Sequence, residues 1–252
     1  MRILALSDIH GFLPKYASLP LPEVDRIMIA GDVCPIYEDH SPEFQKAWLE
    51  NVFAPWVEHL KKPVYFTLGN HDLVDDFQGP SNLRFGTETI IDDVLLFSWT
   101  PEWPPPFIAR TGYWQADETT LAAKLEAVLN SGPTPPIWLT HSPPWGALDL
   151  RFKFSHDVKW WHILRSMPFG SRALRDAAGK YRPKLLICGH VHACPGQKFL
   201  GDTLVYNVCI LDVNYALRRK WKPRVIEFPE QGVPAGRPIQ RKPGDRHAYP
   251  GP

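Results

Sequence analysis

The sequence contains no apolar run that approaches the roughly 20 residues needed to span a bilayer. Its first residues, MRILALSDIHG, include only a short apolar stretch before Asp8 and His10, and no small-residue cleavage site separates the two parts. We therefore expect a buried first strand rather than a secretion signal, no association with a membrane, and a cytoplasmic location.

Cysteine is scarce, and no two cysteines form a CxxC pair. Cys34, Cys188, Cys194 and Cys209 lie far apart in the chain, and we expect free thiols in a reducing compartment. The formal net charge is only +1 at pH 7, so no overall basic field would draw the protein to nucleic acid. These features argue against a disulfide scaffold and against a dedicated DNA-binding protein.

The composition is that of a globular protein, with 44% hydrophobic and 22% charged residues. A chain of 252 residues is long enough for one α/β domain that buries most of its unfolded surface. Many of the 27 prolines gather at 101–106, at 133–144 and after Phe228, where they exclude helix and central strand. We predict one domain over residues 1–228 and a Pro/Gly-rich tail over residues 229–252.

Five short apolar segments each end at polar residues. They are too short for helices and too continuous for half-exposed strands, so they predict a sheet core that is covered on both faces. The five segments are Arg2–Ser7, Arg26–Ala30, Val64–Leu68, Ile137–Thr140 and Leu185–Cys188.

Helices are predicted between these strands. Ser41 or Asp39 could cap a helix through Glu43–Leu60, which Pro55 should break or kink. Two further helices are predicted over Asp117–Leu129 and Ser171–Lys180. Short alternating runs predict strands of a second, more antiparallel sheet at Thr87–Ile91, Val94–Ser98, Gln197–Leu200, Leu204–Val208 and Arg224–Phe228.

Polar side chains follow all five apolar segments. In open α/β sheets, ligands bind outside the carboxyl ends of the strands, so we expect these side chains to form one site. Asp8 and His10, like His190 and His192, are two residues apart, a spacing that turns both members to one side of a strand. The candidate ligands are Asp8, His10, Asp32, Asn70, His141, His190 and His192.

This ligand set exceeds the needs of one tetrahedral zinc and suits two metal ions that share a carboxylate. Mixed oxygen and nitrogen ligation favours Mn²⁺, Fe, Zn²⁺ or Ni²⁺ over Ca²⁺. Gly31, Gly69 and Gly189 each precede a ligand, where a side chain would crowd the metals. Taken singly, each ligand could be a helix cap, a turn residue or a buried histidine; taken together, clustered carboxylates are costly without cations.

Five motifs in order carry a resemblance to a known family. They are SDIHG (7–11), GDVC (31–34), GNHD (69–72), THSPPWG (140–146) and GHVH (189–192). The set resembles the calcineurin-like metallophosphoesterases, whose pattern is DxH, GD, GNH[DE], a lone His and GHxH. The resemblance implies an α/β fold, a four-layer α-β-β-α sandwich of two mixed sheets flanked by helices, with the metal site at the carboxyl ends of the strands.

A narrower resemblance is to the metallophosphoesterase-domain (MPPED-like) phosphodiesterases. It rests on HSPPWGALDL and on ALRDAAGKYRPKLLICGHVH, which are similar to segments of that branch. The chain departs from the branch by extra residues at Arg151–Phe169, which are rich in tryptophan and basic side chains.

The family resemblance also implies roles for the site residues. One metal, with Mn²⁺ as the first expectation, would be held by Asp8, His10 and His192, and the second by Asn70, His141 and His190, with Asp32 bridging both. A hydroxide between the metals would attack phosphorus, and His71 would protonate the leaving alkoxide. His71 could instead be a structural histidine. Asp72 could orient the His71 imidazole, although structural hydrogen bonding is the expected role of Asp72.

Several functions stay open at this point. A phosphodiesterase acting on a small or nucleotide-like ester comes first, and the same motifs allow a phosphomonoesterase. Related protein phosphatases place arginines near the positions where this chain has Val33 and Leu68. The chain would therefore lack the bidentate arginine contacts that bind the phosphate of a phosphoprotein. A repair nuclease would need a basic DNA track. A non-catalytic metal-binding regulator is disfavoured by the intact ligand set, and the sequence leaves the oligomeric state open.

Overall fold

The computed structural model describes residues 1–13, 22–36, 39, 41–102, 113–150, 168–218 and 224–228. Most of the extra segment at Arg151–Phe169 and the whole tail at 229–252 lie outside the described residues. The predicted domain boundary after residue 228 therefore stays a prediction. Among the described helices, none has the length and apolar character that crossing a bilayer requires.

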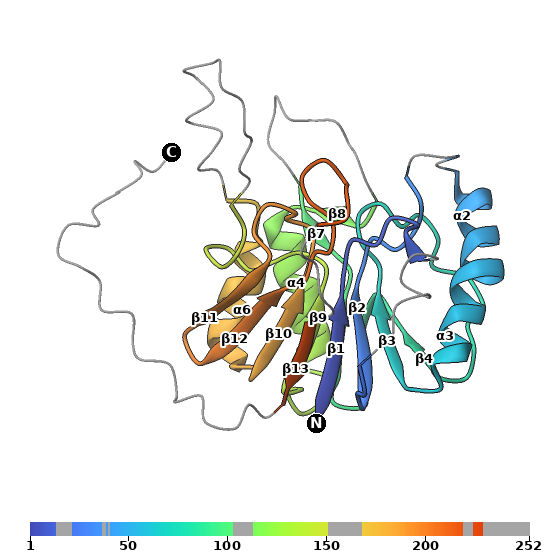
Figure 1. Cartoon of the computed structure of the whole chain (residues 1–252). Helices are drawn as coiled ribbons and strands as arrows, with labels where there is room; N and C mark the ends of the chain where they lie inside the picture. The colour runs from blue at the N-terminus through green and yellow to red at the C-terminus, as the bar shows by residue number, and fades with distance from the viewer. Residues whose placement is uncertain are drawn as a thin grey trace, which may run out of the picture.

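The first of two mixed sheets has five strands (Figure 1). Across the sheet they are β13 (Arg224–Glu227), β1 (Arg2–Leu6), β2 (Arg26–Ala30), β3 (Val64–Thr67) and β4 (Leu83–Phe85). All neighbours are parallel except β13, which runs antiparallel to β1. The prediction that Arg224–Phe228 joins the second sheet was wrong. An alternating pattern identifies a strand but does not select its partner, and β13 covers the free edge of β1.

The second sheet has six strands. Across the sheet they are β11 (Gly196–Leu200), β12 (Thr203–Asn207), β10 (Leu185–Cys188), β9 (Ile137–Thr140), β6 (Val94–Phe97) and β5 (Glu88–Ile91). The four inner strands are parallel, and only β11 and β5 at the edges are antiparallel to their neighbours. A short parallel pair, β7 (Thr100–Pro101) and β8 (Gln115–Ala116), lies apart from both sheets. The five predicted core strands are thus divided between two sheets.

The predicted helix after Ser41 is interrupted near Pro55, as expected. It consists of α2 (Pro42–Trp48), a π-helical segment η1 (Leu49–Phe53) and α3 (Ala54–Leu60). Pro55 has no N–H and its ring would clash with a carbonyl one turn earlier, so the wider π turn is the local solution. Ser41 caps the start, because its Oγ accepts a 3.2 Å hydrogen bond from the N–H of Phe44.

The other two predicted helices also form, and each begins at a side-chain cap. Helix α4 (Glu118–Leu129) follows Asp117, whose carboxylate accepts hydrogen bonds from the backbone N–H groups of Thr119 and Thr120. Helix α6 (Arg172–Tyr181) follows Ser171, which caps it in the same way. Such caps satisfy N–H groups that have no partner inside the helix.

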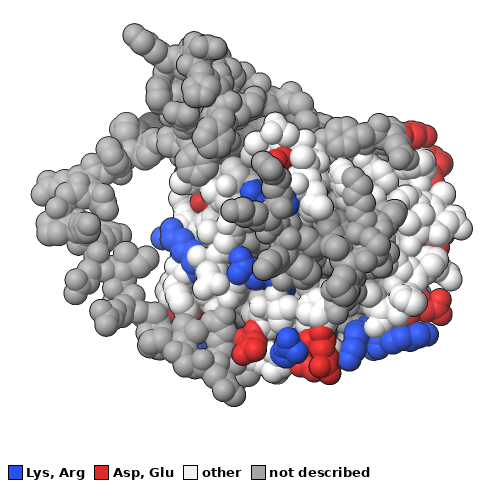
Figure 2. All heavy atoms as spheres, viewed as in Figure 1, with Lys and Arg blue, Asp and Glu red and all other residues white. Residues whose placement is uncertain are grey.

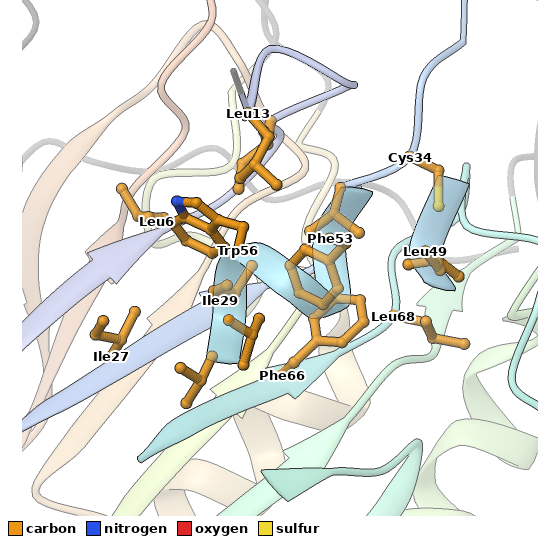
Figure 3. Close-up of a cluster of buried hydrophobic side chains, with 14 of the residues drawn as sticks. Leu6, Leu13, Ile27, Ile29, Cys34, Leu49, Phe53, Trp56, Phe66 and Leu68 are labelled. Carbon is orange, nitrogen blue, oxygen red and sulfur yellow. The ribbon is translucent and has the colours of Figure 1, made fainter. Parts of the chain in front are cut away.

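Three hydrophobic cores separate four layers. Between the first sheet and its helices, Phe53 and Trp56 pack on Leu6, Ile29 and Phe66 (Figure 3). The facing sheets enclose a second core that includes Ile3, Ala5, Leu139 and Ile187, and the third core joins the second sheet to α4 and α6. Alternate residues of each inner strand therefore enter different cores, which explains the continuous apolar runs. The predicted four-layer α-β-β-α sandwich is confirmed.

Candidate metal centre

The candidate ligands lie at one edge of the sandwich, where the strands end (Figure 1, top). Asp8, Asp32 and Asn70 follow β1, β2 and β3 of the first sheet. His141 and His190 follow β9 and β10 of the second sheet. Both sheets therefore contribute to the site, and their facing arrangement is what brings the side chains together.

Asn70 and Asp32 lie between imidazoles of the cluster. The Oδ1 atom of Asn70 is 3.0 Å from His141 Nε2 and 2.8 Å from His190 Nδ1. The Oδ2 atom of Asp32 is 3.5 Å from His141 Nε2 and 3.7 Å from His10 Nε2. One carboxylate therefore approaches two histidines from different parts of the chain, as a shared ligand would.

Asp8 connects the remaining residues to this cluster. Its Oδ1 atom lies 3.1 Å from His192 Nε2. Asp8, His10 and His192 can each place a ligand atom within 4.8 Å of those of the other two, and so can Asp8, Asp32 and His141. The structure thus brings all seven predicted side chains into one connected cluster, most of it buried.

The backbone at four of these positions is left-handed. The φ angles are 56° at Asp8, 46° at His10, 55° at Asp32 and 66° at His190. The explanation offered for the two-residue spacing was therefore wrong: β1 ends at Leu6 and β10 at Cys188, so Asp8, His10 and His190 lie in turns and not in strands. Residues other than glycine rarely adopt this conformation, and such strain clusters at functional sites.

Two histidines are held in the tautomer that a metal ligand needs. The Nδ1–H of His141 donates a 2.7 Å hydrogen bond to the carbonyl oxygen of Ala30, and that of His192 donates a 3.0 Å bond to the carbonyl oxygen of Asp212. A carbonyl only accepts, so Nδ1 of each ring carries a proton and Nε2 is the ring atom left to bind a cation once its own proton is displaced.

His10 provides the test of whether a metal fits. Its ring is buried, and neither Nδ1 nor Nε2 has a hydrogen-bond partner among the described residues. Buried polar atoms in native proteins are nearly always partnered. A cation between His10, Asp8 and Asp32 would satisfy the ring and balance two buried carboxylates, so the donor set fits a metal centre.

The carboxyl and imidazole groups of the cluster have strongly shifted pKa values in the metal-free protein. Burial opposes ionisation of Asp8 and Asp32, but the neighbouring imidazoles outweigh it and hold both carboxyl pKa values well below the usual range. Burial lowers the pKa of His10 to about 4, and burial with the nearby His141 lowers that of His190 to about 3. Burial also opposes protonation of His141, yet Asp32 raises its pKa to about 9.

The second oxygen of Asp8 is held by neighbours that sequence reasoning missed. Ser7 Oγ and Cys209 Sγ both donate to Asp8 Oδ2, the thiol at 2.9 Å. This leaves Oδ1 on the side of His192. No local motif marks Cys209, although its place after an alternating strand run was visible. Cys34 and Cys194 are not in either candidate ligand group of the described residues.

His71 lies beside the cluster. Its backbone N–H donates a 2.8 Å hydrogen bond to Asp32 Oδ1, and its ring centroid is 5.5 Å from that of His10. The buried Gln45 of α2 holds this turn: its Nε2 donates to the carbonyl oxygen of His71 at 2.8 Å, and its Oε1 accepts from the N–H of Leu73 at 2.7 Å. Gln45 was not predicted from the sequence. A polar residue within a predicted helix does not by itself indicate contact with a site.

Asp72 is engaged with the backbone. Its carboxylate accepts hydrogen bonds of 2.7 to 3.0 Å from four N–H groups, those of Asp32, Val33, Cys34 and Gly69. Burial and the nearby Asp32 raise its pKa to about 6. The structural role expected for Asp72 therefore has direct support, since both oxygens hold the turns that carry the ligands.

Three glycines leave space at the cluster that a side chain would fill. A Cβ at Gly69 would overlap Asp32 Oδ1, and a Cβ at Gly189 would overlap Ser7 Oγ and Asp8 Oδ2. Gly31 has a φ of 83°, and a Cβ there would approach His141 Nδ1 to 2.6 Å. The glycines therefore allow the turns to meet at the cluster. That a side chain at these positions would crowd the metals stays a prediction.

The fold has relatives among solved structures. One crystal structure is 15% identical over 82% of this chain and 89% of its own, with a TM-score of 0.58. The phosphopantetheinyl hydrolase PptH of Mycobacterium tuberculosis is 15% identical over 93% of this chain and 98% of its own, with a TM-score of 0.55. At such identity the likeness concerns the fold alone.

Sequence comparison is more specific about the family. Curated protein sequences give no match to the chain. A family model described as calcineurin-like phosphoesterase matches residues 1–194, which include all five motifs and every candidate ligand. With the sandwich fold and the ligand cluster in place, the chain belongs to the calcineurin-like phosphoesterase family.

Proposed function

We propose that this protein is a phosphodiesterase that uses two divalent metal ions to hydrolyse small or nucleotide-like phosphodiesters. Membership of the calcineurin-like phosphoesterase family supports a metal-dependent hydrolase. The observation that carries the proposal is the buried cluster at the strand ends, in which His10 has no hydrogen-bond partner among the described residues and Asp32 lies between two imidazoles. Mn²⁺ is the first candidate ion, followed by Fe, Zn²⁺ and Ni²⁺.

The cluster divides into two ligand sets around Asp32. One set would be Asp8, His10 and His192, which already form a compact group. The other would be Asn70, His141 and His190, whose side chains are joined through Asn70 Oδ1. When bound, divalent cations supply Lewis acidity, which lowers the pKa of water and neutralises charge on the phosphate.

His71 is the proposed general acid. It follows the ligand Asn70 in sequence, and its backbone is tied to Asp32 Oδ1, so its position depends on the same carboxylate that would bridge the metals. A proton held on the His71 ring would pass to the leaving alkoxide as the phosphorus–oxygen bond breaks. Asp32, Gln45 and the turn around Asp72 position this histidine through its backbone.

The alternative functions differ in the substrate that the site would bind. A phosphomonoesterase would use the same residues, and a protein phosphatase would need arginines that Val33 and Leu68 replace. A nuclease would need a basic DNA track, whereas the formal net charge of the chain is only +1. On the face drawn in Figure 2, acidic and basic side chains alternate along the lower edge. We retain the MPPED-like branch as the proposed affiliation, on the segments HSPPWGALDL and ALRDAAGKYRPKLLICGHVH.

A substrate panel with the Mn²⁺-loaded protein tests the proposal. It compares a bis-aryl phosphodiester, an aryl phosphomonoester, cyclic nucleotides and, because of the name of one structural relative, a phosphopantetheinyl substrate. We expect hydrolysis of the diesters, no activity after chelation, and no activity in Asp32→Ala. A strong preference for the monoester would reject the diesterase assignment, and failure on every ester would favour a non-catalytic regulator.

A further inference from the structure

A closed loop follows the last strand of the second sheet. This loop, residues 211–218, lies above the strand ends in Figure 1, drawn in orange-red, and beyond residue 194, where the family match ends. The N–H of Asp212 donates to the carbonyl oxygen of Ala216 at 2.9 Å. The Asp212 Oδ1 atom accepts from the N–H groups of Asn214 and Ala216 at 2.9 and 3.1 Å. The loop is thus held together by its own hydrogen bonds.

The 211–218 loop is fastened to a candidate ligand. The carbonyl oxygen of Asp212 accepts the 3.0 Å hydrogen bond from His192 Nδ1. At the other end of the loop, Arg218 Nη2 donates to the carbonyl oxygen of His192. Both ends of the loop are therefore hydrogen-bonded to the same candidate ligand.

Tyr215 is the residue that this loop presents to the site. Its ring centroid is 5.1 Å from that of His10 and 4.7 Å from that of His192. Its φ of 57° is unusual for a bulky residue, and such strain is retained where the surroundings require one side-chain direction. His71 contacts the same His10 ring at 5.5 Å. Tyr215 and the proposed acid thus border one imidazole.

Two exposed apolar side chains belong to segments that are connected to this part of the site. Val213 of the same loop is 42% exposed. Tyr113 is 55% exposed, and its N–H donates a 2.9 Å hydrogen bond to the carbonyl oxygen of Asn70, which directly precedes His71. A flat aromatic group packs well on the side chains of tyrosine and valine. A short alkyl or hydroxyl group would leave these apolar surfaces exposed to water.

We propose that Tyr215 determines substrate specificity by forming one wall of a subsite that receives an aromatic ester group of the substrate, beside His71. The proposal rests on the phosphoesterase function proposed above and names the kind of ester that the site prefers. A ring in this subsite would stack on or meet the edge of Tyr215 while its phosphate lies at the metal ligands.

Binding of two phosphonates to the Mn²⁺-loaded protein tests this without turnover. Phenylphosphonate and methylphosphonate share the anionic group and differ in the ring, and calorimetry gives the ratio of their dissociation constants. We expect the wild-type protein and Tyr215→Phe to bind phenylphosphonate about 10-fold more tightly than methylphosphonate. In Tyr215→Leu and Tyr215→Ala the ratio should fall about 3- to 10-fold, with methylphosphonate affinity and metal content unchanged.

The outcomes separate the inference from the function on which it rests. An unchanged ratio in Tyr215→Ala, or equal affinity of the wild-type protein for both phosphonates, would overturn the aromatic subsite while leaving the phosphoesterase intact. Loss of metal from Tyr215→Phe as well as Tyr215→Ala would show that Tyr215 only supports the ligands. Failure of the metal-loaded wild-type protein to bind either phosphonate would reject the proposed function together with the subsite.

Discussion

The carboxylate of Asp72 accepts a 2.7 Å hydrogen bond from the backbone N–H of Asp32, across 40 residues of sequence. Three more buried N–H groups share this acceptor. Asp72→Ala should therefore lower the free energy of unfolding by about 3–5 kcal/mol, because several buried donors lose their partner at once. Urea denaturation measures this loss. Asp76→Ala is the control: Asp76 is exposed and forms a surface ion pair with Lys46, so the stability of this variant should match that of the wild type.

Substitutions of His71 and Asp32 should have different effects on metal content and activity. His71→Ala should keep its metal content but lose activity by about 10²- to 10⁴-fold, the range that general acid catalysis contributes. Asp32→Ala should lose both, because Asp32 Oδ2 lies close to His10 and His141. Metal analysis and steady-state kinetics on the two purified variants decide this. A fully active His71→Ala enzyme would remove His71 as the acid.

Metal affinity should rise with pH. In the metal-free protein, burial opposes protonation of His141 and His192, yet Asp32 raises the pKa of His141 to about 9 and Asp8 raises that of His192. A proton on Nε2 excludes a cation, so Mn²⁺ affinity should increase about tenfold per pH unit for each proton displaced, between pH 6.5 and 9.

The metal-free protein should show the opposite trend in stability. A raised histidine pKa stabilises the fold fully below about pH 6.5, and that contribution is lost as the pH rises through the folded-state value near 9. Calorimetric titration at several pH values, together with denaturation of the chelated protein, measures both trends. A flat affinity profile over this range would contradict the assignment of His141 and His192 as ligands.

Two glycine substitutions should have opposite effects. In Gly189→Ala the new methyl group would overlap Ser7 Oγ and Asp8 Oδ2, so metal binding and stability should both fall. In Gly179→Ala the methyl group meets open space on helix α6, and stability should rise by about 0.5–1 kcal/mol. Thermal denaturation and metal analysis of the pair check this. Wild-type metal content in Gly189→Ala would show that the turn can move away.

Much of the fold was predictable because local signals were strong. Apolar runs identified the inner strands, and Ser41, Asp117 and Ser171 marked the helix starts, since capping is a local interaction. The division of the inner strands between two sheets was not predictable in this way, nor was the pairing of β13 with β1. Both depend on contacts between residues far apart in sequence.

The candidate site shows the same limit. Its ligands follow apolar strands and could be found from the sequence, whereas the left-handed backbone at Asp8 and His190 could not. Gln45, Cys209 and Tyr215 reach the site from a helix, a strand end and a loop, where no spacing links them to the ligands. Their roles follow only from the assembled structure.

The hydrogen bonds of Gln45 connect the outer helical layer with the turn that carries His71. Because Gln45 belongs to α2 and bonds to the backbone of His71 and Leu73, a tilt of this helix would displace the proposed proton donor. Asn70, a proposed metal ligand, directly precedes His71 and would move with it, whereas the ligands after β1, β9 and β10 lie in other segments. A compound or antibody that binds the outer surface of α2 and tilts this helix would then act as a remote inhibitor that slows turnover.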